Sequence, residues 1–99
     1  MIKTVIITKD FVKSLQIYWI TKKSLVLKVL EIKNHLENFW FDIQLFQQYD
    51  IKNLWNNYFR VKFIPYRIII FMRDNNTFEF VELFKRKGKS DYKKYNSPQ

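Results

Sequence analysis

The sequence is short of the residues that build metal sites and disulfide bonds, because it has no cysteine and only one histidine. Without cysteine, disulfides and cysteine–zinc sites are excluded. The single histidine, His35, leaves neither a histidine cluster for a metal nor a Ser/His/Asp triad of the usual kind. Its place within a helical pattern predicts a surface or boundary position. We therefore expect no metal and no cofactor.

Long apolar runs are also missing. No uninterrupted apolar stretch approaches the roughly 20 residues of a membrane span. Residues 1–8 combine one lysine with a very short apolar run, which is not typical of a signal peptide. These features predict a cytoplasmic protein that does not enter a membrane. The length of 99 residues fits one domain, which we place at residues 1–95, and residues 96–99 are expected to form a flexible C-terminal end.

Small side chains are scarce, because alanine is absent and glycine occurs once, whereas aromatic residues make up 19% of the chain. A domain of this size buries roughly 60–70% of the surface that its unfolded chain exposes, so its core is small. Large rings must therefore fill that core. We predict that Trp19, Trp40 and Trp55 pack there rather than form a platform on which bases stack.

Acidic residues are outnumbered two to one, and the imbalance is concentrated in the second half of the chain. Residues 1–51 hold seven Lys/Arg against five Asp/Glu, a net charge of +2, whereas residues 52–99 hold eleven against four, a net charge of +7. Such asymmetry indicates a polyanionic partner, most often nucleic acid. A basic surface also serves solubility, so the charge alone leaves both interpretations open.

The first half of the chain has a strand pattern followed by two helix patterns. Residues 3–7 are a short β-branched run that predicts a strand. Thr8 is a candidate N-cap for a helix over residues 9–22, and apolar residues at helical spacing predict a second helix over residues 24–39. Residues 41–53 mix apolar and polar residues without clean periodicity and predict an irregular connection.

The second half has strand patterns separated by turn signals. Residues 54–63 read "LWNNYFRVKF" and alternate as a half-buried strand does. Residues 66–72 are apolar almost throughout, as in a central strand, and "DNNT" is a hairpin signal before a third run at residues 78–84. The order predicts an α+β fold: an N-terminal strand, a two-helix hairpin and a three-stranded antiparallel β-meander forming one sheet, with the helices on one face.

Two tight turns would bring basic residues together on this sheet. If residues 64–65 and 75–76 are two-residue loops, Lys62 lies directly opposite Arg67, and Arg86 is diagonal to Arg67. The resulting basic patch comprises Arg60, Lys62, Arg67 and Arg86. Like charges placed opposite one another destabilise a sheet, and a bound phosphate would relieve the repulsion. A three-residue loop would instead change the parity and scatter the patch.

Two segments of the second half carry recognisable motifs, "YFRVKF…YRIIIF" and "FKRKGKSDY". The former resembles the basic strand and the following "YR" strand of the RelE branch of the RelE/ParE toxin superfamily. The latter resembles that family's closing "KR" with a tyrosine six residues later. The likeness spans residues 1–95 in element order and is most specific in residues 58–92. It implies a RelE-like toxin of a type II toxin–antitoxin system, a metal-independent endoribonuclease (mRNA interferase) that cuts mRNA in the ribosomal A site.

The resemblance implies roles for individual residues. The family's catalytic positions match Lys62, Arg67, Arg86 and Tyr92. Further RNA or phosphate contacts are expected at Arg60, Lys85, Lys87, Lys89 and Lys93. Two departures concern Pro65, which stands where the family often has glycine, and Tyr95, which lies close enough to compete with Tyr92. The family's usual helix-rich tail is absent or very short.

The chemistry implied for these residues uses the nucleophile that RNA itself carries, the 2′-OH beside the scissile phosphate. Tyr92 would act as the base, since a cluster of cations favours a phenolate and lowers the tyrosine pKa from its free value of about 10. Lys62 and Arg67 would hold the phosphate, and Arg86 would neutralise or protonate the leaving 5′-oxygen. Gly88, the only glycine, could form the bend that brings Tyr92 over the patch.

Other interpretations stay open. The chain could be a ParE-like inhibitor of DNA gyrase without enzymatic activity, or a catalytically inactive relative that binds an antitoxin. Arg86 and Tyr92 favour the nuclease, because the inhibitor branch generally lacks this pair, although residues 84–95 are also typical of a solvated tail. The expected partners are the ribosome, mRNA and a cognate antitoxin, with the toxin monomeric inside a hetero-oligomeric complex. The antitoxin would lay an acidic or amphipathic segment on the basic face or the helical hairpin.

Overall fold

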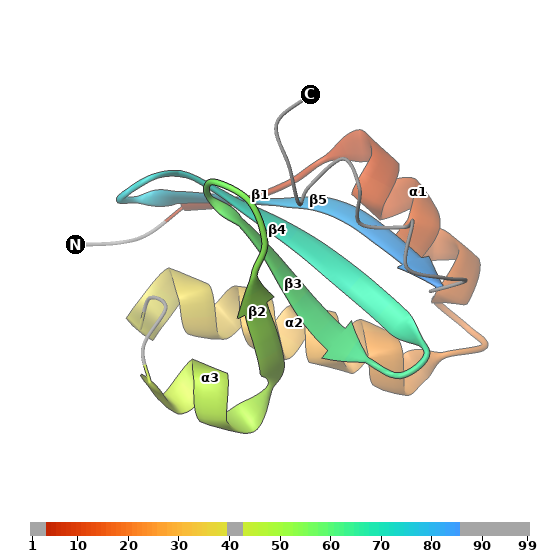
Figure 1. Ribbon diagram of the computed structural model, residues 1–99. Coiled ribbons are helices and arrows are strands. Elements are labelled where there is room, and N and C mark those ends of the chain that lie inside the picture. Colours follow the sequence, from red (N-terminus) through yellow and green to blue (C-terminus); the bar gives the residue numbers. More distant parts are fainter. Residues whose placement is uncertain (1–3, 40–42, 86–99) are drawn as a thin grey trace.

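Five strands and three helices form an α+β fold in the part of the chain that the computed structural model describes, residues 4–39 and 43–85 (Figure 1). In chain order they are β1 (Thr4–Ile7), α1 (Lys9–Tyr18), α2 (Lys23–Phe39), α3 (Ile43–Gln48), β2 (Asp50–Asn53), β3 (Tyr58–Phe63), β4 (Tyr66–Asp74) and β5 (Thr77–Lys85). The strands form one sheet in the order β1-β5-β4-β3-β2. β1 runs parallel to β5, and every other neighbouring pair is antiparallel.

The predicted α+β class is confirmed, but the predicted three-stranded meander is wrong. The meander has four strands, β2 to β5, and β1 makes the sheet five-stranded. The missing strand and α3 both lie in residues 41–53, which were expected to be irregular. Their signals are weak because Leu45 is buried while residues 44 and 46–48 of the six-residue α3 are exposed, and β2 has Ile51 half-buried between exposed neighbours. Segments this short do not show a full period of either pattern.

Residues 54–57, assigned to a strand from the sequence, form a turn. The N–H of Leu54 donates to the carbonyl of Tyr58 at 2.9 Å, and the N–H of Tyr58 donates to the carbonyl of Trp55 at 3.1 Å. Asn56 has a φ of 55°, a left-handed conformation that asparagine tolerates better than most residues. β3 therefore begins only at Tyr58.

The helical hairpin covers one face of the sheet, as predicted (Figure 1). Thr8 caps α1: its Oγ1 accepts from the N–H of Phe11 at 3.2 Å and lies 3.0 Å and 3.1 Å from the carbonyl oxygens of Phe80 and Val81 on β5. The N-terminus of α1 is thus attached directly to the sheet. The helix ends at Tyr18, four residues earlier than predicted.

The core lies between this hairpin and the sheet. It joins Phe11 and Leu15 of α1 to the apolar stripe of α2 and to inward-facing residues of β3, β4 and β5. Phe11 and Phe80 are fully buried and pack edge to face with ring centroids 5.3 Å apart. The expectation that large rings fill the core is confirmed for these residues. His35 is half-buried on α2, which confirms its predicted boundary position.

The prediction that the tryptophans are core residues is wrong for the two that the structure describes. Trp19 is 55% exposed and Trp55 is 39% exposed, while Trp40 lies outside the described residues. Trp19 follows the last residue of α1 and so leaves the helical stripe, and Tyr18 takes the inward position against the ring of Tyr66, 5.0 Å away. Trp55 lies in the turn before β3.

A polar contact attaches the start of β2 to α2. The phenol of Tyr49 lies 2.8 Å from Oε2 of Glu31, and Nζ of Lys28 lies 5.7 Å from the centre of the Tyr49 ring. Burial, and secondly the hydrogen bond to the Glu31 carboxylate, raise the pKa of Tyr49 to about 12. Over residues 4–39 and 43–85, the structure contains no helix with the length and apolar character needed to cross a membrane.

Candidate nucleic-acid interface

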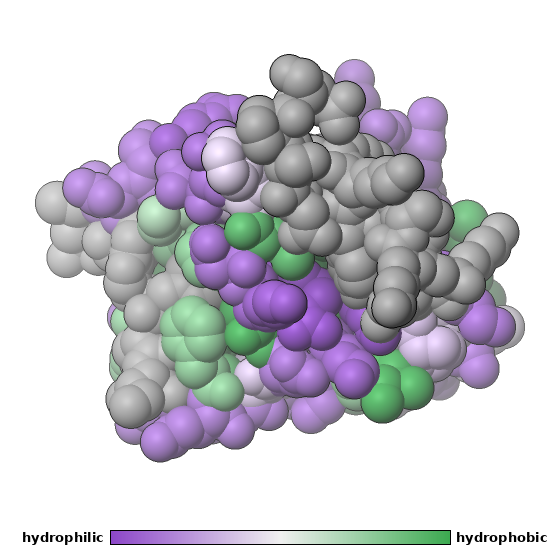
Figure 2. All heavy atoms as spheres, in the orientation of Figure 1, coloured by the Kyte–Doolittle hydropathy of each residue, from purple (hydrophilic) through white to green (hydrophobic). Residues whose placement is uncertain are grey.

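The side chains of β3 alternate between the two faces of the sheet, as the pleat requires. Val61 and Phe63 belong to the core beneath the helices, whereas Tyr58 packs with Ile69 of β4 on the opposite side. We call this opposite side the distal face. Figure 2, which views it in the orientation of Figure 1, shows hydrophilic atoms gathered over β2, β3 and β4. Arg60 and Lys62 share the parity of Tyr58 and therefore belong to this face.

The predicted register of Lys62 and Arg67 is confirmed. Phe63 pairs with Tyr66, so the loop is formed by two residues, Ile64 and Pro65, whose peptide bond is cis. Lys62 is the direct cross-strand partner of Arg67. The structure thus brings together three of the four residues in the expected patch. We call Arg60, Lys62 and Arg67 the basic cluster.

Arg67 is nearly enclosed, with 4% of its surface exposed. Its Nη1 donates to the carbonyl of Tyr66 at 2.9 Å, while its Nε is buried and has no hydrogen-bond partner among the described residues. The side chain of Arg60 is 13% exposed, and its Nε is likewise buried without a partner. Buried donors normally find an acceptor. Two arginines on neighbouring strands, each with a donor to spare, are therefore suited to an anion with several oxygens.

Strand β2 adds two charged residues that the sequence did not single out. Its register places Asp50 opposite Lys62 and Lys52 opposite Arg60. Nη2 of Arg60 lies 3.2 Å from Oδ1 of Asp50. In the sequence, this strand is indicated only by the order of a charged, an apolar and a charged residue at positions 50–52. Three alternating residues are too few to identify a strand. The distal face therefore contains a carboxylate inside its basic cluster.

The remaining predicted site residues do not join the described cluster. Lys85 ends β5 opposite Tyr66, a core residue, so its parity directs it to the helix-covered side rather than the distal face. The others lie outside the described residues: Arg86, Lys87, Lys89, Tyr92 and Lys93, together with the alternative Tyr95 and the expected bend at Gly88. In residues 4–39 and 43–85 no group of three or more His, Cys, Asp or Glu side chains could hold a metal ion.

A second candidate interaction surface lies on the helical hairpin. Two adjacent hollows share Trp19. One is lined by Val12, Leu15, Gln16, Trp19 and Ile20, and the other by Trp19, Lys23, Val26, Leu27 and Leu30. We call these residues the apolar groove. Ile20 and Leu27 are 79% and 59% exposed, and exposed apolar residues gathered in this way mark interaction surfaces more often than scattered ones do.

The chain was compared with protein-family models, curated proteins and solved structures. No protein-family model, no curated protein and no solved structure matches this chain.

Proposed function

We propose that this chain is the toxin of a type II toxin–antitoxin system, with a RelE-like fold and a ribosome-dependent endoribonuclease activity against mRNA. The observation that carries the proposal is the direct pairing of Lys62 with Arg67 on the distal face. Like charges in this position destabilise a sheet, so stability alone does not account for the pair. A phosphate held between them turns the repulsion into two charge-assisted contacts.

The order of elements supports the same proposal. A strand, a helical hairpin, the short helix α3 and then a four-stranded antiparallel meander follow one another along the chain. Apart from α3 and the added strand β2, this is the order that the resemblance implies. The basic cluster lies on β3 and β4, the two strands that carry the "YFRVKF" and "YRIIIF" motifs. The motifs and the geometry thus refer to the same residues.

In the proposed reaction, the 2′-oxygen of the RNA forms a bond to the adjacent phosphorus, and the bond from phosphorus to the 5′-oxygen breaks. Lys62 and Arg67 hold the phosphate and stabilise its developing charge. Tyr92 accepts the proton of the 2′-OH, and Arg86 neutralises or protonates the leaving 5′-oxygen, which ends as a hydroxyl. Binding in the ribosomal A site supplies much of the positioning, and the protein acts in the cytoplasm, where ribosomes are found.

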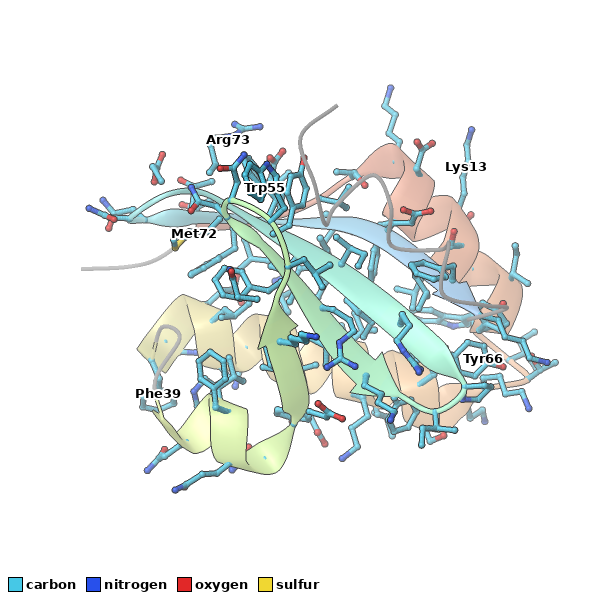
Figure 3. The ribbon with its side chains drawn as sticks, in the orientation of Figure 1. Lys13, Phe39, Trp55, Tyr66, Met72 and Arg73 are labelled. Carbon is cyan, nitrogen blue, oxygen red and sulfur yellow. The ribbon has the colours of Figure 1, made fainter. Side chains whose placement is uncertain are left out.

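The test is cleavage of mRNA on purified ribosomes by the wild type and by single variants. Tyr92→Phe is expected to lower the cleavage rate by roughly 10²–10⁴-fold, the usual size of a general acid–base contribution. Lys62→Ala and Arg67→Lys should lower the cleavage rate more than they lower ribosome affinity. The matched control is Arg73→Ala, because Arg73 lies on the same strand as Arg67 but is exposed at its other end (Figure 3).

Full activity of Tyr92→Phe would refute the assignment of the base and direct the same test to Tyr95. If Lys62→Ala lost only ribosome binding, Lys62 would be a positioning residue. Translation arrest without cut mRNA would count against the nuclease. DNA damage on induction, with mRNA intact, would instead identify a gyrase inhibitor, and loss of both effects would identify an inactive relative.

We further propose that a cognate antitoxin binds the apolar groove with an acidic amphipathic helix. The groove is lined by residues of α1, of the following connection and of α2, and it presents exposed apolar side chains of the kind that an amphipathic helix contacts. Its surroundings are basic: residues 9–23 carry Lys9, Lys13, Lys22 and Lys23 against one acidic residue, Asp10. A second copy of this chain, with a formal net charge of +9, would meet like charge there, whereas an acidic segment would not. The toxin is then a monomer within a hetero-oligomeric complex.

This partner is tested by co-expressing toxin variants with the product of the neighbouring gene. Ile20→Glu and Leu27→Glu place a carboxylate in the groove and should leave the toxin active but no longer neutralised. Ile17→Glu is the control, since Ile17 is 71% exposed on α1 but does not line the groove. Neutralisation of all three variants would contradict docking at the groove and leave the distal face as the alternative.

A further inference from the structure

The basic cluster has an acidic member that comes from a different strand. Asp50 begins the edge strand β2, directly opposite Lys62. Its Oδ1 lies 3.2 Å from Nη2 of Arg60, the residue diagonal to it on β3. One carboxylate is therefore placed against two cations of a surface whose other features favour an anion. A phosphate arriving at this surface meets a negative charge that already occupies part of it.

The two partners of this ion pair differ in their exposure. The side chain of Asp50 is 57% exposed, whereas that of Arg60 is 13% exposed. The guanidinium of Arg60 is thus held in place by its neighbours in the sheet. The carboxylate of Asp50 is solvent-exposed and can rotate away from Arg60. Arg60 uses one Nη on Asp50 and leaves its Nε without a partner among the described residues. The contact with Asp50 is consequently weaker than the two-pronged contact that a phosphate can form with the same guanidinium.

We propose that Asp50 is an internal counter-ion of the basic cluster, which holds Arg60 in the free protein and which RNA phosphates must displace. In taking RNA as the competing anion, the inference rests on the proposed function. Asp50 offsets one of the three positive charges of the cluster when no RNA is bound and lowers its affinity for RNA phosphates that are not otherwise positioned. Cleavage then favours RNA that the ribosome presents, because only a positioned phosphate displaces the carboxylate efficiently.

The competing explanation is that Asp50 only attaches the edge strand β2 to β3. Both roles use the same ion pair, so a loss of stability cannot separate them. They differ in the effect on RNA affinity. A counter-ion that is removed frees Arg60 and raises affinity, whereas a structural tie that is removed loosens β2 and leaves affinity unchanged or lower.

The experiment measures binding of a fluorescein-labelled short oligouridine by fluorescence anisotropy, without ribosomes, over a series of KCl concentrations. Asp50→Asn is compared with Glu37→Gln, which adds the same charge and also removes one partner of an ion pair, with Lys33 on α2 at 3.0 Å. Asp50→Asn should bind about fivefold more tightly than Glu37→Gln, the effect of an exposed ion pair at its upper range. It should also steepen the salt dependence of log K by about 0.7, since one further cation contacts a phosphate of a single strand.

A double-mutant cycle tests whether the effect passes through Arg60. In an Arg60→Gln background, Asp50→Asn should gain markedly less affinity than it does in the wild type, because the arginine that it would release is gone. Circular dichroism of each variant shows whether the sheet is retained. An equal gain in both backgrounds would overturn the assignment of Arg60 as the residue that Asp50 holds.

Equal affinities and equal salt dependences of Asp50→Asn and Glu37→Gln would overturn the proposal, since net charge alone would then account for the gain. Absence of oligouridine binding by both the wild type and Asp50→Asn would overturn it as well. The nuclease is judged separately, by cleavage on ribosomes. If the wild type cuts no mRNA but Asp50→Asn still exceeds Glu37→Gln in affinity and in salt dependence, the proposed function fails and the counter-ion role stands.

Discussion

At the scale of single residues, Tyr49 has the clearest pKa shift in residues 4–39 and 43–85, and it does not belong to the basic cluster. Its phenol donates a hydrogen bond to the Glu31 carboxylate at 2.8 Å. Burial, as the larger cause, and this hydrogen bond raise the pKa of Tyr49 to about 12. The residue precedes β2, the strand that carries Asp50 and Lys52. Tyr49 therefore stabilises the position of the edge strand β2 without belonging to the basic cluster.

This shift makes stability depend on pH in the alkaline range. The folded state holds the phenolic proton more tightly than the unfolded state, whose tyrosine has a pKa of about 10. The contribution of Tyr49 is therefore complete below about pH 10 and is lost as the pH rises to about 12. Urea unfolding of the wild type and of Tyr49→Phe should show a difference of about 1 kcal/mol at neutral pH that closes over this range. A difference that persists above about pH 12 would contradict the assignment.

The pairing of Lys62 with Arg67 follows from the two-residue loop alone, whereas the predicted pairing of Arg67 with Phe84 holds only because two register shifts cancel. Counting back from the β4–β5 turn pairs Arg67 with Phe84, as observed. Between these points, however, β4 has an extra residue near Arg73 and β5 has one at Val81, and the two shifts cancel. A single bulge of this kind would have reversed the face of every residue beyond it. The turn sequences predict the ends of the hairpin but not what happens between them.

At the scale of elements, Thr8 connects α1 to the sheet. One hydroxyl caps the helix at Phe11 and contacts two carbonyl oxygens of β5. Thr8→Ala is expected to lower the free energy of unfolding by about 1–2 kcal/mol, because it removes both the cap and the contact with the sheet. In a domain of this size, each kcal/mol lowers Tm by roughly 4–8 °C, which thermal unfolding measures.

Two further variants serve as controls for Thr8→Ala. Thr8→Ser keeps the hydroxyl and should lose less stability than Thr8→Ala. Thr21→Ala changes an exposed threonine in the connection between α1 and α2, and surface changes of this kind stay within about 0.5 kcal/mol. Equal losses for Thr8→Ala and Thr21→Ala would mean that the cap and the contact with the sheet contribute no more than an exposed threonine does.

Elements were predictable where the pattern is long and one-sided, and unpredictable where an element is short or lies at an edge. The stripe on α2 and the alternation of β3 each continue for several residues, so the second helix and the central strands follow from the sequence. The four residues of β2 contain one half-buried side chain. Their strand conformation depends on the neighbouring β3, which is information that the local sequence does not hold.

At the scale of the whole molecule, positive charge is in excess. The chain carries a formal net charge of +9, and the ion pairs at Glu31, Glu37, Asp50 and Glu79 involve partly exposed groups, which contribute little each. Repulsion among the positively charged side chains should therefore exceed the attraction within the ion pairs.

Salt is accordingly expected to stabilise the fold. Raising NaCl from low concentration to about 0.15 M shortens the Debye length to about 8 Å and should raise Tm, at roughly 4–8 °C for each kcal/mol of repulsion relieved. Differential scanning calorimetry over this range measures the change. At matched ionic strength, potassium sulfate should raise Tm more for the wild type than for Lys62→Ala if the basic cluster binds the dianion, because the general effect of sulfate acts on both proteins. A Tm that falls with NaCl would show instead that attractive pairs dominate.

The parallel pairing of β1 with β5 has a consequence for how the protein is made. Thr4 pairs with Thr77, and Ile7 pairs with Phe80. The strand β1 therefore cannot pair until β5, the last described strand, has been synthesised. During synthesis the helical hairpin emerges early, with Phe11 and the stripe of α2 still lacking the sheet that buries them. Contacts of such long range form late and slowly. A nascent chain therefore has no complete distal face until translation of this sequence is nearly finished, and a truncated product that ends before β5 is unable to assemble one.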